Sequence, residues 1–294
     1  MWTLENDRLR LTISETGAEP QSIQRLSDGY EYLWQGDPVF WEERAPLLFP
    51  FCGRVKNSRI LLDGRIYANQ SIHGFIRMQT FTLKEKTRTS LVLSQQSDEK
   101  TRALYPFDYT ITVSYTLDGP SVRIGYRVTN PSKEETLPYS IGFHPGFNIP
   151  LEDGLDFSDY RLDFGKEKKP VYTVPLENHI LVRTDRFERC PLREDRYFDL
   201  TREAFLRDIF FENLSECVTL RSDKGAHSIT VQSSGLPFLG VWQPEDNLPG
   251  FICLEPWQGL PDTSGPETDF RDKPFLDQLA PASSRDYRIV LSFT

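Results

Sequence analysis

The stretch YTITVSYTLDGPSVRIGYRV, residues 109–128, alternates apolar and polar residues on both sides of Asp118-Gly119-Pro120. Alternation with a period of two places the apolar side chains on one face of a strand. The Asp-Gly-Pro sequence between the two halves is a turn signal. The stretch therefore predicts a β-hairpin that turns one apolar face toward a core.

Strand-like runs recur at regular intervals through the rest of the chain. They lie at residues 8–13, 81–83, 90–94, 217–220, 227–231 and 287–293. Helical signals are short and fall at residues 98–104 and 201–206. Regularly spaced strands favour a sandwich or barrel, and no repeat or long polar linker divides the chain. We therefore expect an all-β protein with few short helices and a single domain over residues 1–294.

Composition supports strands and limits the classes of partner. Aromatic residues make up 13% of the chain, and there are 21 Pro, 18 Gly and only 2 Met, which favours strands and turns over long helices. The formal net charge of −9 argues against nucleic acid or an anionic membrane as partner. Four scattered cysteines without a C-x-x-C pair, and no export or membrane-spanning run, predict reduced thiols in a cytoplasmic protein.

Two proline-containing motifs suggest an acid–base pair. His144 lies in GFHPGF, residues 142–147, and Glu255 lies in ICLEPWQG, residues 252–259. Proline disfavours the helical region for the residue before it, so both side chains should stand on extended backbone or at strand ends. A histidine titrates near neutrality and an enclosed carboxylate loses hydration, a combination suited to proton transfer. Each dipeptide taken alone is also an ordinary turn signal.

Arg54 and His73 are candidate ligand-binding residues. Arg54 follows glycine in FPFCGRV, residues 49–55, and His73 precedes glycine in SIHGFIR, residues 71–77. Both can donate hydrogen bonds to the oxygens of a polar ligand, although a surface arginine and a hydrogen-bonded core histidine explain them better when each residue is taken alone. Metal-binding spacings, a nucleophile elbow and phosphate-cradling loops do not occur in the sequence. We therefore expect no metal and no cofactor.

The four motifs occur in an order that resembles a known family. FCGR at 51–54, HGF at 73–75, GFHP at 142–145 and LEPW at 254–257 are similar in type and order to those of the aldose 1-epimerase (galactose mutarotase-like) family, in particular its LacX-like branch. The resemblance extends over nearly the whole chain. It implies an antiparallel β-supersandwich with a sugar site in a cleft across one sheet, no cofactor, and interconversion of the α and β anomers of a free hexose.

The resemblance also implies roles for individual residues. The glutamate that matches Glu255 takes the proton of the anomeric hydroxyl, and the histidine that matches His144 protonates the ring oxygen. The ring then opens, the C1–C2 bond rotates, and closure with reversed proton roles gives the other anomer.

Five further residues are assigned to substrate binding through the same resemblance. His73 and Arg54 match sugar-contacting residues, Trp257 is expected to pack against a sugar face, and Asp208 matches an aspartate that binds sugar hydroxyls. Arg77 stands where the related hexose-6-phosphate epimerases have a phosphate-binding arginine, and guanidinium suits phosphate. A phosphorylated hexose is therefore the alternative substrate.

Two other classes of function remain open from the sequence. One is a noncatalytic carbohydrate-binding protein that uses the same residues to hold a sugar. The other is a glycosidase that pairs Glu255 with Asp208 or Asp262, because that reaction uses two carboxylates. In every case we expect a small sugar as partner, no nucleic acid or membrane, and a monomer or homodimer.

Overall fold

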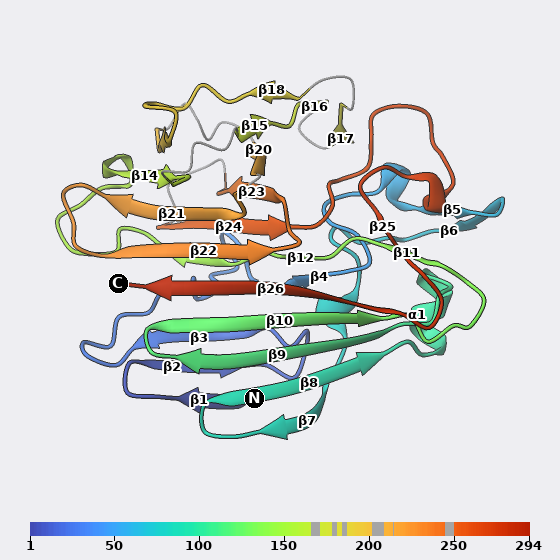
Figure 1. Cartoon of the computed structure of the whole chain (residues 1–294), viewed down its shortest axis with the longest axis horizontal. Helices are drawn as coiled ribbons and strands as arrows, with labels where there is room; N and C mark the ends of the chain where they lie inside the picture. Colours follow the sequence, from blue (N-terminus) through green and yellow to red (C-terminus); the bar gives the residue numbers. More distant parts are fainter. Residues whose placement is uncertain (166–170, 178–180, 184–186, 202–208, 214, 245–249) are drawn as a thin grey trace.

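A nine-stranded antiparallel sheet is the largest element of the computed structural model, which describes residues 1–165, 171–177, 181–183, 187–201, 209–213, 215–244 and 250–294 (Figure 1). Its strands follow the order β19 (Tyr197–Asp199), β14 (Tyr160–Asp163), β21 (Cys217–Ser222), β22 (Ser228–Ser234), β26 (Ser284–Phe293), β10 (Ser121–Thr129), β9 (Thr110–Asp118), β8 (Ser90–Gln96) and β7 (Thr82–Lys86). The last strand of the chain, β26, pairs with both β10 and β22.

A second antiparallel sheet has eight strands and carries the candidate site. Its order is β18 (Glu188–Arg189), β15 (Val171–Thr173), β20 (Ile209–Asn213), β23 (Phe238–Trp242), β24 (Phe251–Trp257), β12 (Gly142–Phe143) and β4 (Leu47–Leu48), with β13 (Gly146–Asn148) also paired to β24.

The remaining strands form small sheets around these two. They are β1 (Trp2–Glu5), β2 (Leu9–Ile13) and β3 (Pro20–Arg25) in one sheet, and the pairs β5 (Ile60–Leu62) with β6 (Arg65–Tyr67), β11 (Leu137–Tyr139) with β25 (Asp277–Leu279), and β16 (Leu176–Glu177) with β17 (Leu181–Val182). The helical segments in the described part of the chain are α1 (Glu99–Leu104) and the 3₁₀ turns η1 (Lys56–Ser58), η2 (Ile76–Met78), η3 (Phe157–Asp159) and η5 (Phe270–Asp272). Among the described residues no helix is long and apolar enough to cross a membrane.

The hairpin predicted from residues 109–128 is confirmed. β9 and β10 pair from Asp118 with Ser121 to Thr110 with Thr129, so the loop is Gly119-Pro120. Gly119 has a φ of 52°, which suits the first central position of a type II′ turn. The predicted short helix is also confirmed as α1, which Asp98 and Thr101 close with a capping box. The other helical signal lies mostly in residues 202–208, outside the described residues.

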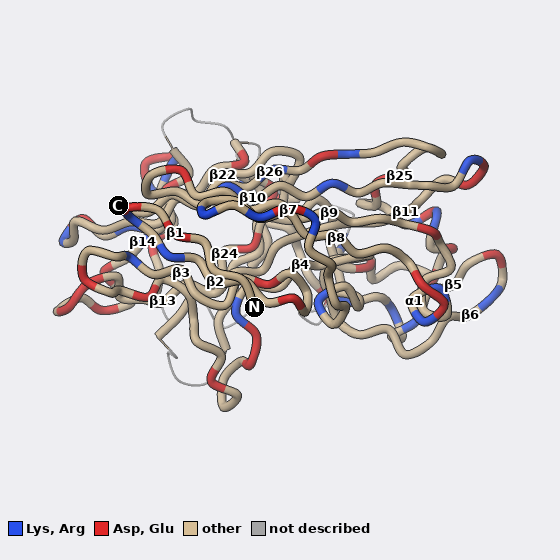
Figure 2. The backbone as a smooth tube through the Cα atoms, turned by 90° about the horizontal axis from the view of Figure 1, so that it is seen from below, with Lys and Arg blue, Asp and Glu red and all other residues tan. Residues whose placement is uncertain are grey.

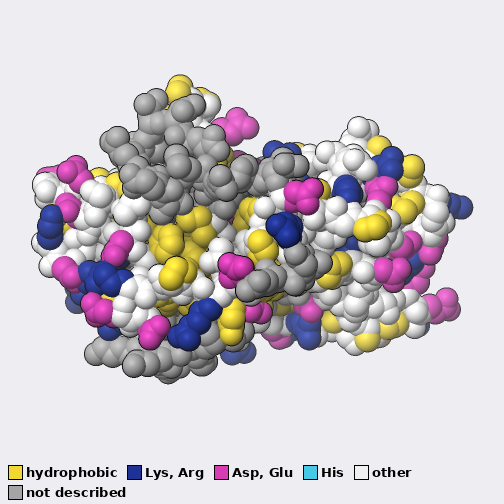
Figure 3. Space-filling model, turned by 90° about the horizontal axis from the view of Figure 1, so that it is seen from above, with side chains coloured by type: hydrophobic (Ala, Val, Ile, Leu, Met, Phe, Trp, Pro, Cys, Tyr) yellow, Lys and Arg dark blue, Asp and Glu magenta, His cyan; other side chains and the backbone are white. Residues whose placement is uncertain are grey.

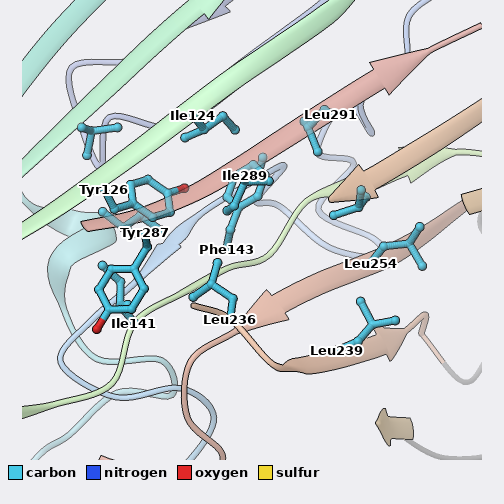
Figure 4. Close-up of a cluster of buried hydrophobic side chains, with 14 of the residues drawn as sticks. Ile124, Tyr126, Ile141, Phe143, Leu236, Leu239, Leu254, Tyr287, Ile289 and Leu291 are labelled. Carbon is cyan, nitrogen blue, oxygen red and sulfur yellow. The ribbon is translucent and has the colours of Figure 1, made fainter. Parts of the chain in front are cut away.

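The core lies between the two large sheets. Figure 4 shows Ile124 and Ile289 from the nine-stranded sheet facing Phe143 and Leu254 from the eight-stranded sheet. These side chains are at most 1% exposed, and they occupy alternate positions on their strands. The all-β class and the antiparallel sandwich arrangement predicted from the sequence are therefore confirmed. Acidic and basic residues are interspersed along the chain in Figure 2.

Candidate active site

Strand β24 contributes to the core with one face and to the candidate site with the other. All seven of its residues are buried. Ile252 and Leu254 belong to the main hydrophobic core, whereas the alternate residues Cys253, Glu255 and Trp257 point away from it because successive strand side chains face opposite sides. On the neighbouring strand β23, Gly240 pairs with Glu255 of β24. Because glycine has no side chain, space is left beside the carboxylate of Glu255.

His144 approaches Glu255 from the edge of β24 that lies opposite to β23. The pairing of β12 and β13 with β24 is interrupted at residues 143–145, between the pairs Gly142–Trp257 and Gly146–Cys253. The histidine Nε2 lies 3.1 Å from Glu255 Oε2. His144 is 7% exposed and Glu255 is 2% exposed. The predicted acid and base therefore form a buried contact pair, each on or beside extended backbone as expected.

Burial changes the proton affinity of His144. Loss of hydration lowers the pKa of its imidazole to about 3, and the positive charge of Arg77 acts in the same direction. The sequence alone suggested a histidine that titrates near neutrality. In the folded protein the imidazolium depends on the carboxylate of Glu255 for compensation, and once formed it is a stronger acid than a histidine in water.

His73 stands beside the pair in a fixed tautomer. Its Nδ1 accepts a hydrogen bond of 3.0 Å from the backbone N–H of Gly53, so the ring proton resides on Nε2. Burial and the neighbouring His144, Arg77 and Arg54 lower its pKa well below the ordinary value. The ring centroids of His73 and His144 are 5.1 Å apart. His73 is therefore a neutral hydrogen-bond donor next to the predicted acid–base pair.

The two candidate arginines differ in how their charges are compensated. Arg54 is exposed, and none of the hydrogen bonds or ion pairs found among the described residues involves its guanidinium. Arg77 Nε instead lies 2.7 Å from Glu43 Oε1, and its Nη1 donates to the carbonyl of Ile72. The sequence-based assignment of Arg77 to a phosphate group stays a prediction.

Trp257 is 1% exposed and packs between protein rings. Its ring centroid lies 4.9 Å from that of Phe210 and 5.5 Å from that of His73. The indole Nε1 is buried and has no hydrogen-bond partner in the described structure, so it is a donor available to a ligand oxygen. Asp208, the other sequence-based candidate for sugar binding, lies outside the described residues.

Asp262, the carboxylate considered for a glycosidase, is engaged elsewhere. It forms an ion pair with Lys273, and the two side chains are 4% and 6% exposed. Its carboxylate also accepts a hydrogen bond from the backbone N–H of Lys56. This bonding gives Asp262 a structural partner and does not favour a second catalytic carboxylate.

Of three further neighbours of the pair, the sequence analysis misses Trp41 and Trp242 and places Cys253 only beside Glu255 in its motif. Trp41 and Trp242 are half-buried and flank His144 with centroid separations of 4.9 and 5.9 Å. Cys253 is fully buried, and one ligand atom from each of His144, Cys253 and Glu255 lies within 4.8 Å of the others. Trp41 lies in an irregular stretch after residue 34. The only feature of the sequence that could have indicated a site residue there is the presence of aromatic residues outside strands.

Apolar side chains are also gathered on the outer surface. Figure 3 shows them near the middle of the face seen from above, which is the side of the molecule that carries β18 and β15 in Figure 1.

Comparison with known proteins gives one consistent family. A family model described as aldose 1-epimerase matches residues 1–268. The chromosomal LacX protein of Lactococcus lactis subsp. lactis is 34% identical over 98% of each chain. A galactose mutarotase-like protein from Lactobacillus casei superposes with a TM-score of 0.93 at 32% identity over 100% of both chains. A galactose mutarotase related enzyme from Lactobacillus acidophilus gives 0.92 at 28% identity over 100% of this chain and 97% of its own.

Proposed function

Because this chain belongs to the aldose 1-epimerase family, we propose that it catalyses the interconversion of the α and β anomers of a free hexose. The observation that carries the proposal is the buried contact of 3.1 Å between His144 Nε2 and Glu255 Oε2. Proton transfer by side chains needs groups within about 2.6–3.2 Å of the atoms they serve. Two such groups side by side suit the anomeric hydroxyl and the ring oxygen, which are bonded to one carbon.

The proton count of the pair is constant in this mechanism. In the reactive state the proton is on His144 and Glu255 is ionised. Glu255 accepts the proton of the anomeric hydroxyl while His144 gives its proton to the ring oxygen, the C1–O5 bond breaks, and the anomeric oxygen becomes the aldehyde oxygen. The pair then holds one proton on Glu255 instead of His144. After rotation about C1–C2, the reverse transfers close the ring on the other face of the aldehyde.

Burial supports this exchange in physical terms. A dry site disfavours the separated charges of imidazolium and carboxylate, which brings the ion pair closer in energy to the neutral pair of imidazole and carboxylic acid. The lowered pKa of His144 makes its imidazolium a better proton donor to the weakly basic ring oxygen.

The neighbouring donors suit a neutral sugar. His73 Nε2–H, the guanidinium of Arg54 and the indole N–H of Trp257 can each bind a hydroxyl or ring oxygen. Glu43 compensates the charge of Arg77 at 2.7 Å, so a phosphate group would have to displace a carboxylate to use that arginine. These contacts support a free hexose over its 6-phosphate as substrate.

The test is anomer exchange followed by NMR. Catalytic amounts of protein are added to freshly dissolved α-glucose, α-galactose and glucose 6-phosphate, with Glu255→Gln and Glu134→Gln proteins in parallel. We expect acceleration with a free hexose and a loss of about 10²–10⁴-fold in Glu255→Gln, the usual range for one general acid or base. Glu134 is exposed, so its variant should be fully active.

Three results would contradict the proposal in different ways. Full activity of Glu255→Gln would remove Glu255 as the base. Sugar binding without acceleration would favour the noncatalytic carbohydrate-binding function. Faster exchange of glucose 6-phosphate than of either free hexose would favour the phosphorylated substrate.

A further inference from the structure

Cys253 gives the acid–base pair a third potential ligand. It stands two residues before Glu255 on β24 and therefore on the same face of the strand. One ligand atom from each of Cys253, Glu255 and His144 lies within 4.8 Å of the others, and the three residues are 0%, 2% and 7% exposed. Thiolate sulfur, carboxylate oxygen and imidazole nitrogen are the three ligand types that zinc takes from proteins.

We propose that Cys253, His144 and Glu255 bind a thiophilic divalent cation, with Zn²⁺ as the reference ion, and that the bound ion inhibits the enzyme by occupying its acid–base pair. The cation-binding part stands on the geometry alone. The inhibition part rests on the proposed epimerase function.

The geometry needs little adjustment. Zinc bonds of about 2.0–2.1 Å to nitrogen and oxygen and about 2.3 Å to sulfur, in a tetrahedron, separate the ligand atoms by roughly 3.3–3.6 Å. The His144 and Glu255 atoms are already 3.1 Å apart. The ligand atoms lie within 4.8 Å of one another, so the sulfur has to approach by at most about 1.2 Å, through a small rotation of the cysteine side chain away from its staggered rotamer. The fourth position would be left to water or another small oxygen ligand.

Local chemistry selects the kind of ion. Cysteine binds metal ions as the thiolate, so cation binding must release the thiol proton of Cys253. A dication compensates both anionic ligands at once, as a single proton cannot. Mg²⁺ gives up its waters reluctantly and prefers oxygen ligands, whereas soft thiolate favours zinc and its thiophilic relatives. A dry site containing one sulfur therefore discriminates against magnesium.

The proposal is tested by titrating Zn²⁺, Cd²⁺ and Mg²⁺ into the reduced full-length protein. Calorimetry measures binding, ultraviolet absorption detects cadmium–thiolate bonds, and NMR anomer exchange measures inhibition. The variants are Cys253→Ala, Cys253→Ser and, as matched control, Cys190→Ala, because Cys190 is also a buried free cysteine but is not part of the cluster. We expect one Zn²⁺ per chain, no response to Mg²⁺, and unchanged binding in Cys190→Ala.

Loss of Cys253 should weaken Zn²⁺ binding by at least about 10–100-fold, the cost already found for disturbing residues that only support a metal ligand. The Cys253 variants should keep epimerase activity without metal and resist inhibition. Equal Zn²⁺ affinity in wild type and both Cys253 variants, or no binding to the wild type, would overturn the proposal. If no sugar is turned over, calorimetry still decides whether the cation site exists, and only the epimerase function fails.

Discussion

Gly74→Ala should damage the protein far more than the same change at Gly64. The two glycines have nearly equal φ angles, 70° and 74°. A Cβ at Gly74 would lie 2.2 Å from the carbonyl oxygen of Phe49 and 2.6 Å from Cδ of Pro50, whereas a Cβ at Gly64 would have nothing within 4 Å. The pair of variants therefore separates steric conflict from backbone conformation.

The magnitude follows from adding the two contributions. A left-handed conformation costs a non-glycine residue about 1–2 kcal/mol, and this applies to both variants. The contact at Gly74 is with backbone and a proline ring, which cannot rotate away, and overpacking of this kind costs a further 1–3 kcal/mol or so. We expect losses in unfolding free energy of about 2–5 kcal/mol for Gly74→Ala and about 1–2 kcal/mol for Gly64→Ala.

Urea unfolding followed by circular dichroism measures both losses, with equal m-values as the condition for comparing them. Anomer exchange gives a second readout. Gly74 follows His73, so a shift near 1 Å at that histidine should cost on the order of 10²-fold in rate, while Gly64→Ala should keep the wild-type rate. Equal losses of stability in the two variants would refute the steric reasoning.

Two further predictions concern charge. Glu43→Gln leaves Arg77 without its carboxylate partner. The variant should bind glucose 6-phosphate more tightly relative to glucose by roughly tenfold or more, because a hydrogen bond to a charged group contributes about 1.5–3 kcal/mol. An unchanged ratio of the KM values for the two sugars would contradict a phosphate-binding role for Arg77. The pKa of His144 falls from 6.5 in the unfolded chain to about 3 on folding. As the pH decreases, the unfolded chain therefore binds this proton before the folded protein does. The free energy of unfolding should fall between about pH 6.5 and about pH 3, by up to about 1.4 kcal/mol per pH unit. Urea unfolding of wild type and His144→Gln across this range should give a shallower dependence in the variant, and identical slopes would argue against a neutral buried histidine.

The strands could be predicted from the sequence because their pattern is local. Alternation along residues 109–128 depends only on neighbouring positions, and the turn glycine marks the loop between them. His144 and Glu255 were also found from their immediate surroundings, since proline and apolar neighbours fix an extended backbone and an enclosed carboxylate.

Other features depend on pairings that no local pattern contains. Trp41 and Trp242 flank His144, although roughly a hundred residues of sequence separate each of them from it. Cys253 is adjacent to a motif residue, but its nearness to His144 follows from the register of β13 on β24. The pKa of His144 follows from burial, which is a property of the assembled sheets.

Strand β24 has no exposed position, and this limits how the protein can diversify. A substitution at Ile252 or Leu254 opens the core, and a substitution at Glu255 or Trp257 alters the candidate site, so the strand offers natural variation few neutral positions. Descendants of this chain could acquire new substrates more readily through the irregular segment that carries Trp41, which packs against His144, and Glu43, which pairs with Arg77. The reaction type would then stay constant with the residues of β24, while the substrate preference would change with the residues of this irregular segment.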